Sequence, residues 1–281
     1  MNKLKKLFSV LLTIAMIISL MSTTIVFAEQ ANPDALPEGY VDNSNEQMLE
    51  LQAKYENQNN DIQLMSTNEL AGKKVEIAFL IDASGSMYPY IAKVKENVTA
   101  MAQYFESAGV NLRMAVVRFG ESEDGYRANV LKINGSSWHT STEQLVETLS
   151  SIPANGGTEA LSDAIGDILN KDPATNITNV QWSSDAYKFA FVLTDDFDYG
   201  VEGLQFNDYG YETLDSTIPD LQNKRIPVSV VTGKYYFSQY KNLAENTGGE
   251  LYDIASPDYL QLLIDYANRC MGVALKAKKA I

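Results

Sequence analysis

The stretch from Val75 to Tyr88, VEIAFLIDASGSMY, constrains the fold more than any other part of the chain. It begins with an almost continuous apolar run over 77–81, without the alternation of a half-exposed strand. Such a run is typical of a strand that is buried on both faces of a parallel sheet. The run ends at Asp82, so the sequence predicts a carboxylate at the carboxyl end of a central strand, where open α/β sheets bind their ligands.

Two hydroxyl side chains, Ser84 and Ser86, follow Asp82 at alternate positions. Oxygen ligands of this kind suit a hard divalent cation, Mg²⁺ first, with Mn²⁺ or Ca²⁺ as alternatives. Asp, Ser and Gly are also common turn residues, and Ser often caps a helix. Taken alone, the pattern therefore leaves a simple turn open.

Two further stretches favour the metal site. A second buried strand is predicted over 187–194 and also ends in a carboxylate, Asp195. Because the carboxyl ends of neighbouring parallel strands meet at one edge of a sheet, we expect Asp82 and Asp195 to lie close together and to neutralise a divalent cation. The other stretch ends in Thr158, which follows a double glycine. Thr158 either caps the next helix or directs its hydroxyl at the same cation.

Helical and strand patterns fill the rest of the domain. An apolar stripe at helical spacing over 89–107 predicts a strong helix after the Asp82 turn. A short strand over 130–133 lies near hairpin distance from a strand over 112–119, which favours an antiparallel edge strand. Further helices are expected over 142–152, 158–169, 213–224, 238–246 and 257–271, and further strands over 227–231 and 250–254.

The chain divides into four parts. Residues 1–28 predict a secretory signal peptide, with a lysine-rich start, an apolar core and a cleavage site that ends at Ala28. An uncleaved membrane anchor is the disfavoured alternative. Residues 29–70 are a polar, Asn- and Gln-rich extension with one short helix, residues 71–272 form the domain, and residues 273–281 form a basic tail.

Composition narrows the function further. The chain has 281 residues, which suits one α/β domain with a short extension, and a formal net charge of −14. An acidic chain attracts cations and is a poor candidate for binding nucleic acid or anionic membranes. No apolar stretch after the signal is long enough to span a bilayer, so we expect no stable membrane insertion. The single Cys, Cys270, excludes an intrachain disulfide and is expected to be a small buried side chain.

The metal-site residues carry a resemblance to a known family. The D-x-S-x-S pattern of 82–86, the glycine pair before Thr158 and the Leu193-Thr194-Asp195 stretch occur in the order of the von Willebrand factor type A domain. The chain resembles this family over about 73–271. The family's metal-ion-dependent adhesion site is built from such residues. One departure is Asp196, where the family commonly has Gly, and a post-strand turn is the favoured interpretation of this residue.

The resemblance implies an α/β fold with a doubly wound, mostly parallel six-stranded sheet, one antiparallel edge strand and helices on both faces. It implies that Ser84, Ser86 and Thr158 approach the cation directly or through water. Asp82 and Asp195 would hold it largely through water. A carboxylate from a partner protein would then complete the coordination, in keeping with the reluctance of Mg²⁺ to lose all its waters.

Aromatic side chains are expected to surround this site, because Tyr offers a large contact area with a polar tip. For each of them, folding back over the sheet edge is the alternative. The candidates for this ligand rim are Tyr88, Tyr90, Phe197, Tyr199 and Tyr209.

The leading hypothesis is a secreted, divalent-metal-dependent protein-binding (adhesion) module, not an enzyme, whose partner offers an exposed Asp or Glu carboxylate. A metal-assisted hydrolase is one alternative, since bound Mg²⁺ can activate water. Against it, the single His, His139, is expected in a solvated loop, and Ser84 does not lie in G-x-S-x-G. A structural subunit of a surface complex with a stabilising metal is another alternative. The helix over 258–271 is a candidate mobile element, because the family's last helix often shifts on binding.

Overall fold

The computed structural model describes residues 69–120, 128–157, 159–169, 180–196 and 213–272. The predicted signal peptide, nearly all of the polar extension and the basic tail lie outside the described residues. The division of the chain into these parts therefore stays a prediction.

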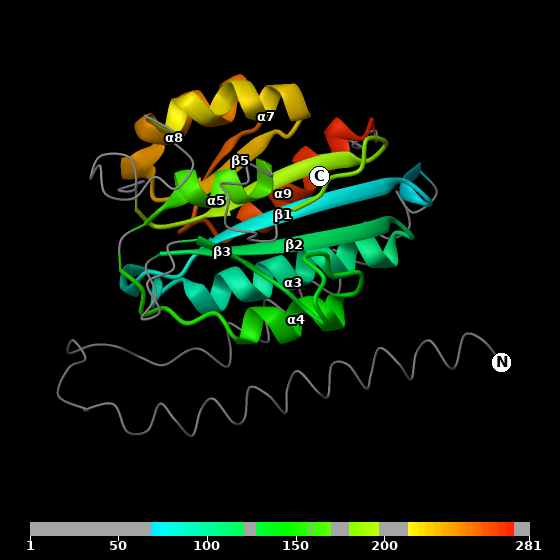
Figure 1. Ribbon diagram of the computed structural model, residues 1–281, viewed down its shortest axis with the longest axis horizontal. Helices are drawn as coiled ribbons and strands as arrows, with labels where there is room; N and C mark the ends of the chain where they lie inside the picture. The colour runs from blue at the N-terminus through cyan, green and yellow to red at the C-terminus, as the bar shows by residue number, and fades with distance from the viewer. Residues whose placement is uncertain (1–68, 121–127, 158, 170–179, 197–212, 273–281) are drawn as a thin grey trace, which may run out of the picture. The chain divides into compact units, whose positions relative to one another are not determined.

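The described residues form a six-stranded sheet in the order β3-β2-β1-β4-β5-β6 (Figure 1). All neighbouring strands pair in parallel except β3, which runs antiparallel to β2 at one edge. This arrangement confirms the predicted fold class and the antiparallel edge strand. The strands are β1 (Lys74–Asp82), β2 (Asn111–Phe119), β3 (Ala128–Leu131), β4 (Tyr187–Leu193), β5 (Val228–Thr232) and β6 (Leu251–Asp253).

Helices cover both faces of the sheet. In Figure 1, α3 and α4 lie below the sheet and α5, α7 and α8 lie above it. The helices are α3 (Ile91–Ser107), α4 (Thr142–Ser150), α5 (Leu161–Leu169), α7 (Ile218–Lys224), α8 (Phe237–Thr247) and α9 (Tyr259–Cys270). Three short 3-10 turns complete the described elements: η2 (Gly85–Met87), η3 (Leu214–Thr217) and η4 (Lys234–Tyr236).

One predicted helix is divided in the structure. The stretch expected to form a single helix over 213–224 begins as the 3-10 turn η3 and continues as α7. Thr213 and Ser216 form a capping box across η3, in which each side chain accepts a hydrogen bond from the other residue's backbone. A 3-10 turn is common at the start of an α-helix, where the first N–H groups lack helical partners.

The inner strands β1, β4 and β5 are buried on both faces over most of their length, as their apolar runs predict. Ala78 and Leu80 of β1 pack with Leu161 and Ile165 of α5 in the core on one side of the sheet. On the other side, Phe189 lies edge-on to Tyr266 of α9, with ring centroids 6.0 Å apart. Because β1 carries apolar side chains to both cores, its end is fixed firmly in space.

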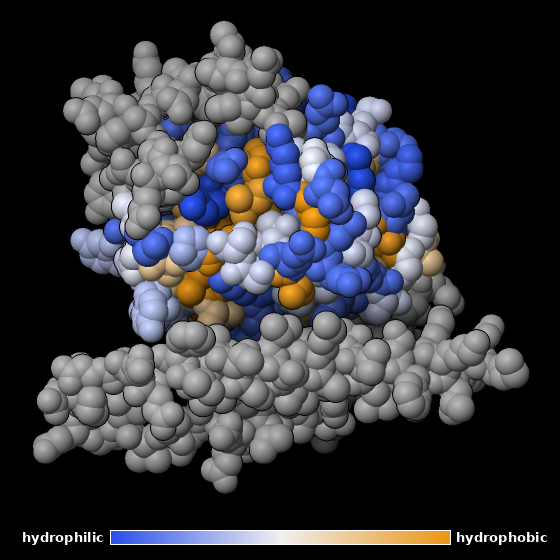
Figure 2. All heavy atoms as spheres, turned by 60° about the horizontal axis from the view of Figure 1, so that its bottom comes forward, coloured by the Kyte–Doolittle hydropathy of each residue, from blue (hydrophilic) through white to orange (hydrophobic). Residues whose placement is uncertain are grey.

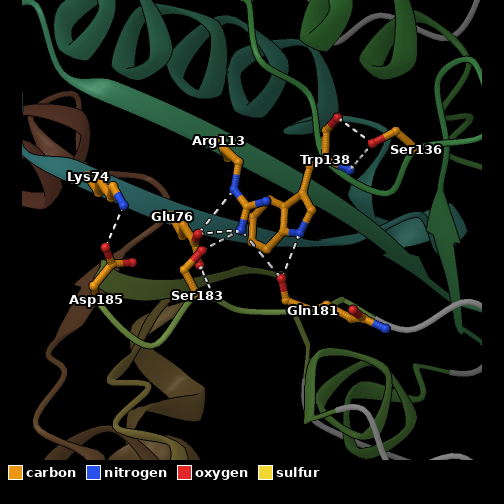
Figure 3. Close-up of polar contacts among 8 residues, drawn as sticks. All are labelled: Lys74, Glu76, Arg113, Ser136, Trp138, Gln181, Ser183 and Asp185. Carbon is orange, nitrogen blue, oxygen red and sulfur yellow. Dashed lines mark hydrogen bonds and ion pairs between the residues drawn. The ribbon is translucent and has the colours of Figure 1, made fainter.

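A partly buried ion pair joins β1 to β2 in the amino-terminal half of the sheet, away from the carboxyl end of β1 (Figure 3). Glu76 of β1 and Arg113 of β2 are register neighbours, and their side chains form an ion pair. Ser183 N donates to Glu76 Oε2 over 2.8 Å. The Arg113 guanidinium also lies 4.6 Å from the centre of the Trp138 ring. Both oxygens of the Glu76 carboxylate therefore have a partner, Oε1 in the ion pair and Oε2 in the hydrogen bond, as a buried charge requires.

Two single-residue expectations are wrong. His139, expected in a solvated loop, is fully buried: Nδ1 lies 3.0 Å from the Met114 carbonyl oxygen and Nε2 lies 2.6 Å from Thr148 Oγ1. A histidine can be buried when both ring nitrogens find partners. Cys270, expected to be buried, is exposed. It is the last residue of α9, where it falls beside the buried stripe rather than within it.

The described residues on the face that Figure 2 shows are mostly hydrophilic. Figure 2 shows hydrophobic residues interspersed among hydrophilic ones on the side of the domain where α3 and α4 lie. No helix in the described part of the chain is long and apolar enough to cross a membrane.

Candidate metal centre

Asp82 ends the central strand with its carboxylate fully buried. Its Oδ1 accepts a hydrogen bond from Ser84 N over 2.8 Å, and its Oδ2 accepts one from Thr194 Oγ1 over 2.6 Å. The second bond follows from the register of β1 and β4, in which Ile81 pairs with Leu193 and so places the next two residues opposite each other. Sequence reasoning assigned no role to Thr194, although its place directly before Asp195 is a usable signal.

A short chain of hydroxyls links the ends of β1 and β4. Ser84 Oγ and Ser86 Oγ lie 2.9 Å apart, and Ser86 Oγ donates to Asp195 Oδ1 over 2.9 Å. The structure thus brings together Asp82, Ser84, Ser86 and Asp195, four of the five predicted metal ligands. The fifth, Thr158, lies outside the described residues.

Asp195 and Asp196 have different surroundings. The Asp195 carboxylate accepts the Ser86 hydroxyl, which places it beside the serine pair. The backbone of Asp196 is held instead: its carbonyl accepts the Tyr240 hydroxyl over 2.7 Å, and its N–H donates to Thr194 Oγ1 over 3.3 Å. This backbone arrangement agrees with the interpretation of Asp196 as part of a turn after the strand.

The loop that carries the serines is held by a second loop. Ala83 O accepts hydrogen bonds from Asn155 N over 3.1 Å and from Gly156 N over 2.8 Å, and Gly85 N donates to Gly156 O over 3.0 Å. These bonds form an isolated parallel bridge between Ser84 and Gly156. The bridge brings the chain that leads to Thr158 alongside the serines.

Gly120 supports the same loop from the end of β2. It has a φ of +98°, and a Cβ added there would lie 3.0 Å from Ser84 N and 3.3 Å from the Ala83 carbonyl carbon. Only glycine adopts this conformation without strain and leaves room for the neighbouring backbone. The sequence shows Gly120 merely as the start of a turn, so its role became visible only with the packing.

The site contains buried acidic side chains that lack a positively charged partner among the described residues. Burial raises the pKa of Asp82 to about 6, although hydrogen bonds from Thr194 and Ser84 partly offset this. Burial also raises the pKa of Asp195. Another acid, Glu159, is buried here as well, and its pKa is raised to about 7 by burial and by the charges of Asp82 and Asp196. Among the described residues, no Lys or Arg forms an ion pair with Asp82, Asp195 or Glu159.

The oxygen donors fit a hard divalent cation. Ser84, Ser86 and Thr194 each have one hydroxyl proton to donate. The carboxylate and hydroxyl oxygens of the site have more lone pairs than these three protons can occupy, so lone pairs remain for a cation. Within the described ranges, no group of three or more His, Cys, Asp or Glu side chains is placed to hold a metal ion. A cation at this edge would therefore depend on hydroxyl oxygens as well as carboxylates, a donor set that suits Mg²⁺.

Aromatic residues occur at the same edge of the sheet. Tyr88, two residues after Ser86, is 79% exposed, whereas Tyr90 is only half-exposed at the start of α3. Tyr235 was missed by sequence reasoning and is 84% exposed in η4, directly beyond the end of β5. Its position after a buried strand could have indicated it. The other three predicted rim residues, Phe197, Tyr199 and Tyr209, lie outside the described residues.

The sheet order and the oxygen-lined site define a doubly wound α/β domain whose candidate ligand site lies at the carboxyl ends of the central strands. The family model of the von Willebrand factor type A domain matches residues 76–265, and the chain belongs to this family. Domains of this family commonly bind proteins, so the family indicates a protein-interaction module.

The chain is also similar to solved structures. One is proximal thread matrix protein 1 from the mussel byssus, with a TM-score of 0.54 and 16% identity; the match covers 70% of this chain and 48% of that protein. Another is the conserved hypothetical protein BatB from Bacteroides thetaiotaomicron, with a TM-score of 0.49 and 14% identity; the match covers 71% of this chain and 100% of that one. No curated protein matches the chain.

Proposed function

We propose that this protein is a secreted adhesion module that binds a partner protein through a divalent cation. The cation would be Mg²⁺, with Mn²⁺ or Ca²⁺ as alternatives. The observation that carries the proposal is the convergence of Asp82, Ser84, Ser86 and Asp195 at the ends of β1 and β4, with more acceptor oxygens than donor protons.

Each group in the site would have a distinct role. Ser84 and Ser86, together with Thr158, would offer uncharged oxygens to the cation directly or through water. Asp82 is held by two hydrogen bonds and would contribute its charge largely through water, as would Asp195. Few direct carboxylate bonds leave a cation electrophilic, so that an Asp or Glu carboxylate of the partner protein could complete its coordination.

The exposed tyrosines support a protein partner. Tyr88 and Tyr235 are the two most exposed large hydrophobic side chains in the described part of the chain, and both follow the carboxyl end of a strand. Tyrosines that combine apolar area with a polar tip are enriched at protein interfaces. They would contact the partner around the carboxylate that reaches the cation.

A binding role is favoured over a catalytic one by His139. This side chain is the only His in the chain, and both of its ring nitrogens are engaged inside the core on β2 and α4. It therefore lacks the access that a general base needs. A hydrolase built on this centre would have to take its base from another kind of side chain.

The predicted signal peptide supports export of the protein. Cleavage after Ala28 would release a mature chain that begins at Glu29. Intact-mass measurement of the protein from the culture medium tests this directly. Recovery only from cells, with residues 1–28 still attached, would contradict secretion.

The function itself is tested by metal-dependent capture. The immobilised mature chain is incubated with proteins from the surface of neighbouring cells in Mg²⁺ or in EDTA, beside an Asp82→Ala variant. We expect a protein that is retained by the wild type in Mg²⁺ and released by EDTA or by the substitution. The captured protein is then changed at its exposed Asp and Glu residues, and one such change should abolish binding. Equal capture in EDTA and by the variant would argue against the proposal.

A further inference from the structure

Tyr240 of α8 is a buried tyrosine whose hydroxyl reaches the turn at the end of β4. Its exposed fraction is 1%, and it belongs to the same core cluster as Val192 of β4 and Val230 of β5. The hydroxyl donates a hydrogen bond to Asp196 O over 2.7 Å. Because side chains in a close-packed core have little freedom to move, the hydroxyl holds the Asp196 carbonyl at a fixed place.

The turn after β4 positions both carboxylates of the predicted metal centre. Asp196 N donates to Thr194 Oγ1 over 3.3 Å, and the same hydroxyl donates to Asp82 Oδ2 over 2.6 Å. Asp195 lies between Thr194 and Asp196 in the chain, and its carboxylate accepts the hydroxyl of Ser86. A displacement of Asp196 would therefore move Asp195 and disturb the hydrogen bond that orients Asp82.

A purely structural role for Tyr240 is the alternative. A buried tyrosine hydroxyl needs a hydrogen-bond partner, and a carbonyl at the end of a strand can provide one without any effect on a ligand site. The same kind of bond occurs at Tyr266 of α9, which is 3% exposed and donates to Gly248 O over 2.7 Å. Gly248 lies between the end of α8 and the start of β6, on the amino-terminal side of the sheet. The two tyrosines therefore make matching hydrogen bonds at opposite ends of the sheet.

We propose that Tyr240 is a positioning residue of the metal centre, whose hydroxyl holds the turn after β4 so that Asp82 and Asp195 stay in place for one cation. This inference rests on the proposed function. The hydroxyl lies outside the oxygens that would bind the cation and adds no charge to the site. It would therefore change cation affinity through the geometry of the turn alone.

The experiment compares the wild-type mature chain with Tyr240→Phe, Asp82→Ala and, as a matched control, Tyr266→Phe. Each Phe substitution removes one hydroxyl and keeps the packed ring, so we expect both variants to fold. Mg²⁺ and Mn²⁺ are titrated separately by calorimetry into the metal-free proteins at about pH 8, above the raised pKa of Asp82. Hydrogen exchange of the Asp196 amide, followed by nuclear magnetic resonance, reports how easily the turn opens.

We expect Tyr240→Phe to weaken cation binding by about tenfold, the low end of the usual effect of removing an outer-shell group. The Asp196 amide should exchange faster in metal-free Tyr240→Phe than in the wild type, because the carbonyl of the same residue is no longer held. Tyr266→Phe should lower the thermal midpoint by a similar amount, since it loses the same kind of bond, yet keep the wild-type cation affinity and Asp196 exchange rate. A loss of affinity confined to Tyr240→Phe is a result that a purely structural role would not give.

The possible failures are distinguishable. Wild-type affinity in Tyr240→Phe, together with loss of binding in Asp82→Ala, would overturn this inference and leave the proposed function standing. An equal loss of affinity in Tyr240→Phe and Tyr266→Phe would also overturn it, because lower stability alone would then explain the weaker binding. Absence of Mg²⁺ and Mn²⁺ binding in the wild type would overturn both the inference and the proposed function.

Discussion

At the scale of single residues, burial and hydrogen bonding prepare Asp82 for a positive charge. The carboxylate is fully buried, and its two hydrogen bonds do not fully offset the loss of water, so its pKa is raised to about 6. A nearby cation would favour the ionised form and reverse this shift. The hydroxyls of Ser84 and Ser86 would add ligands for such a cation without adding charge, which would keep the total negative charge of the site moderate.

Gly120→Ala should disturb the centre without touching a predicted ligand. The new Cβ would press on Ser84 N and the Ala83 carbonyl, at a φ that a side chain adopts with strain. We expect a loss of stability of about 1–3 kcal/mol for the strained backbone, and weaker Mg²⁺ binding because the serine loop must shift. Urea unfolding and calorimetry measure the two effects.

Gly135→Ala is the matched control for this substitution. Gly135 also has a positive φ, +79°, but a Cβ added there meets nothing within 4 Å. It should lose stability from backbone strain alone and keep the Mg²⁺ affinity of the wild type. Equal Mg²⁺ affinities in the two variants would show that Gly120 does not support the site.

His139 gives a prediction for the dependence of stability on pH. Burial lowers its pKa in the folded state, so at pH values below about 6.5 the unfolded chain binds a proton that the folded chain does not. The contribution of His139 to stability is therefore fully present above that value and decreases as the pH falls towards the folded-state pKa.

Nuclear magnetic resonance tests this prediction directly, because the chain contains one His. Its ring signal should stay that of the neutral imidazole through pH 6.5 and titrate only at lower pH. Since the buried acids change stability in the opposite direction, urea unfolding of the wild type is compared with that of His139→Gln between about pH 5 and 7.5. A ring that titrates at pH 6.5 or above would show that the buried arrangement is wrong.

At the scale of elements, the ion pair between Glu76 and Arg113 joins β1 to β2 at the amino-terminal end of the sheet, opposite the candidate metal centre. Glu76 is 3% exposed, so removing its partner leaves a buried charge uncompensated. We expect Arg113→Met to lower the free energy of unfolding by about 3 kcal/mol. Urea unfolding followed by circular dichroism measures the change.

The double variant Glu76→Leu with Arg113→Met separates the ion pair from simple packing. With both charges gone, much of the lost stability should return, since an apolar pair of similar volume often replaces a buried ion pair without loss. A double variant that is less stable than Arg113→Met would indicate that Glu76 stabilises the fold through its bond with Ser183 rather than through the ion pair.

Elements that are determined by local sequence patterns could be predicted, whereas contacts between residues far apart in the chain could not. The strands that end in Asp82 and Asp195 were predictable, because continuous apolar runs report burial on both faces. His139 was misjudged because its polar neighbours in the sequence say nothing of its contacts with Met114 of β2 and Thr148 of α4. The pairing of Glu76 with Arg113 depends on strand register, which no local pattern reveals. Burial of Glu159 likewise follows from loop contacts.

At the scale of the whole molecule, strand order determines where a ligand can bind. The central strand β1 has β2 on one side and β4 on the other. The helix α3, which connects β1 to β2, lies on one face of the sheet, and α7, which connects β4 to β5, lies on the other (Figure 1). The carboxyl ends of β1 and β4 therefore meet at a point where the chain reverses its direction of winding, as in other open α/β sheets that bind ligands. All four described members of the predicted metal centre lie at this point or in the loop beside it.

Thermal unfolding with and without cations tests the central claim most directly. The mature chain and Asp82→Ala are heated in EDTA and in Mg²⁺, Mn²⁺ or Ca²⁺. At a concentration of about one hundred times its dissociation constant, an ion that binds only the folded state should stabilise the wild type by about 2.7 kcal/mol. We predict a raised midpoint with at least one ion in the wild type and none in Asp82→Ala. Equal midpoints in EDTA and in every ion, or the same rise in both proteins, would contradict a cation site at Asp82.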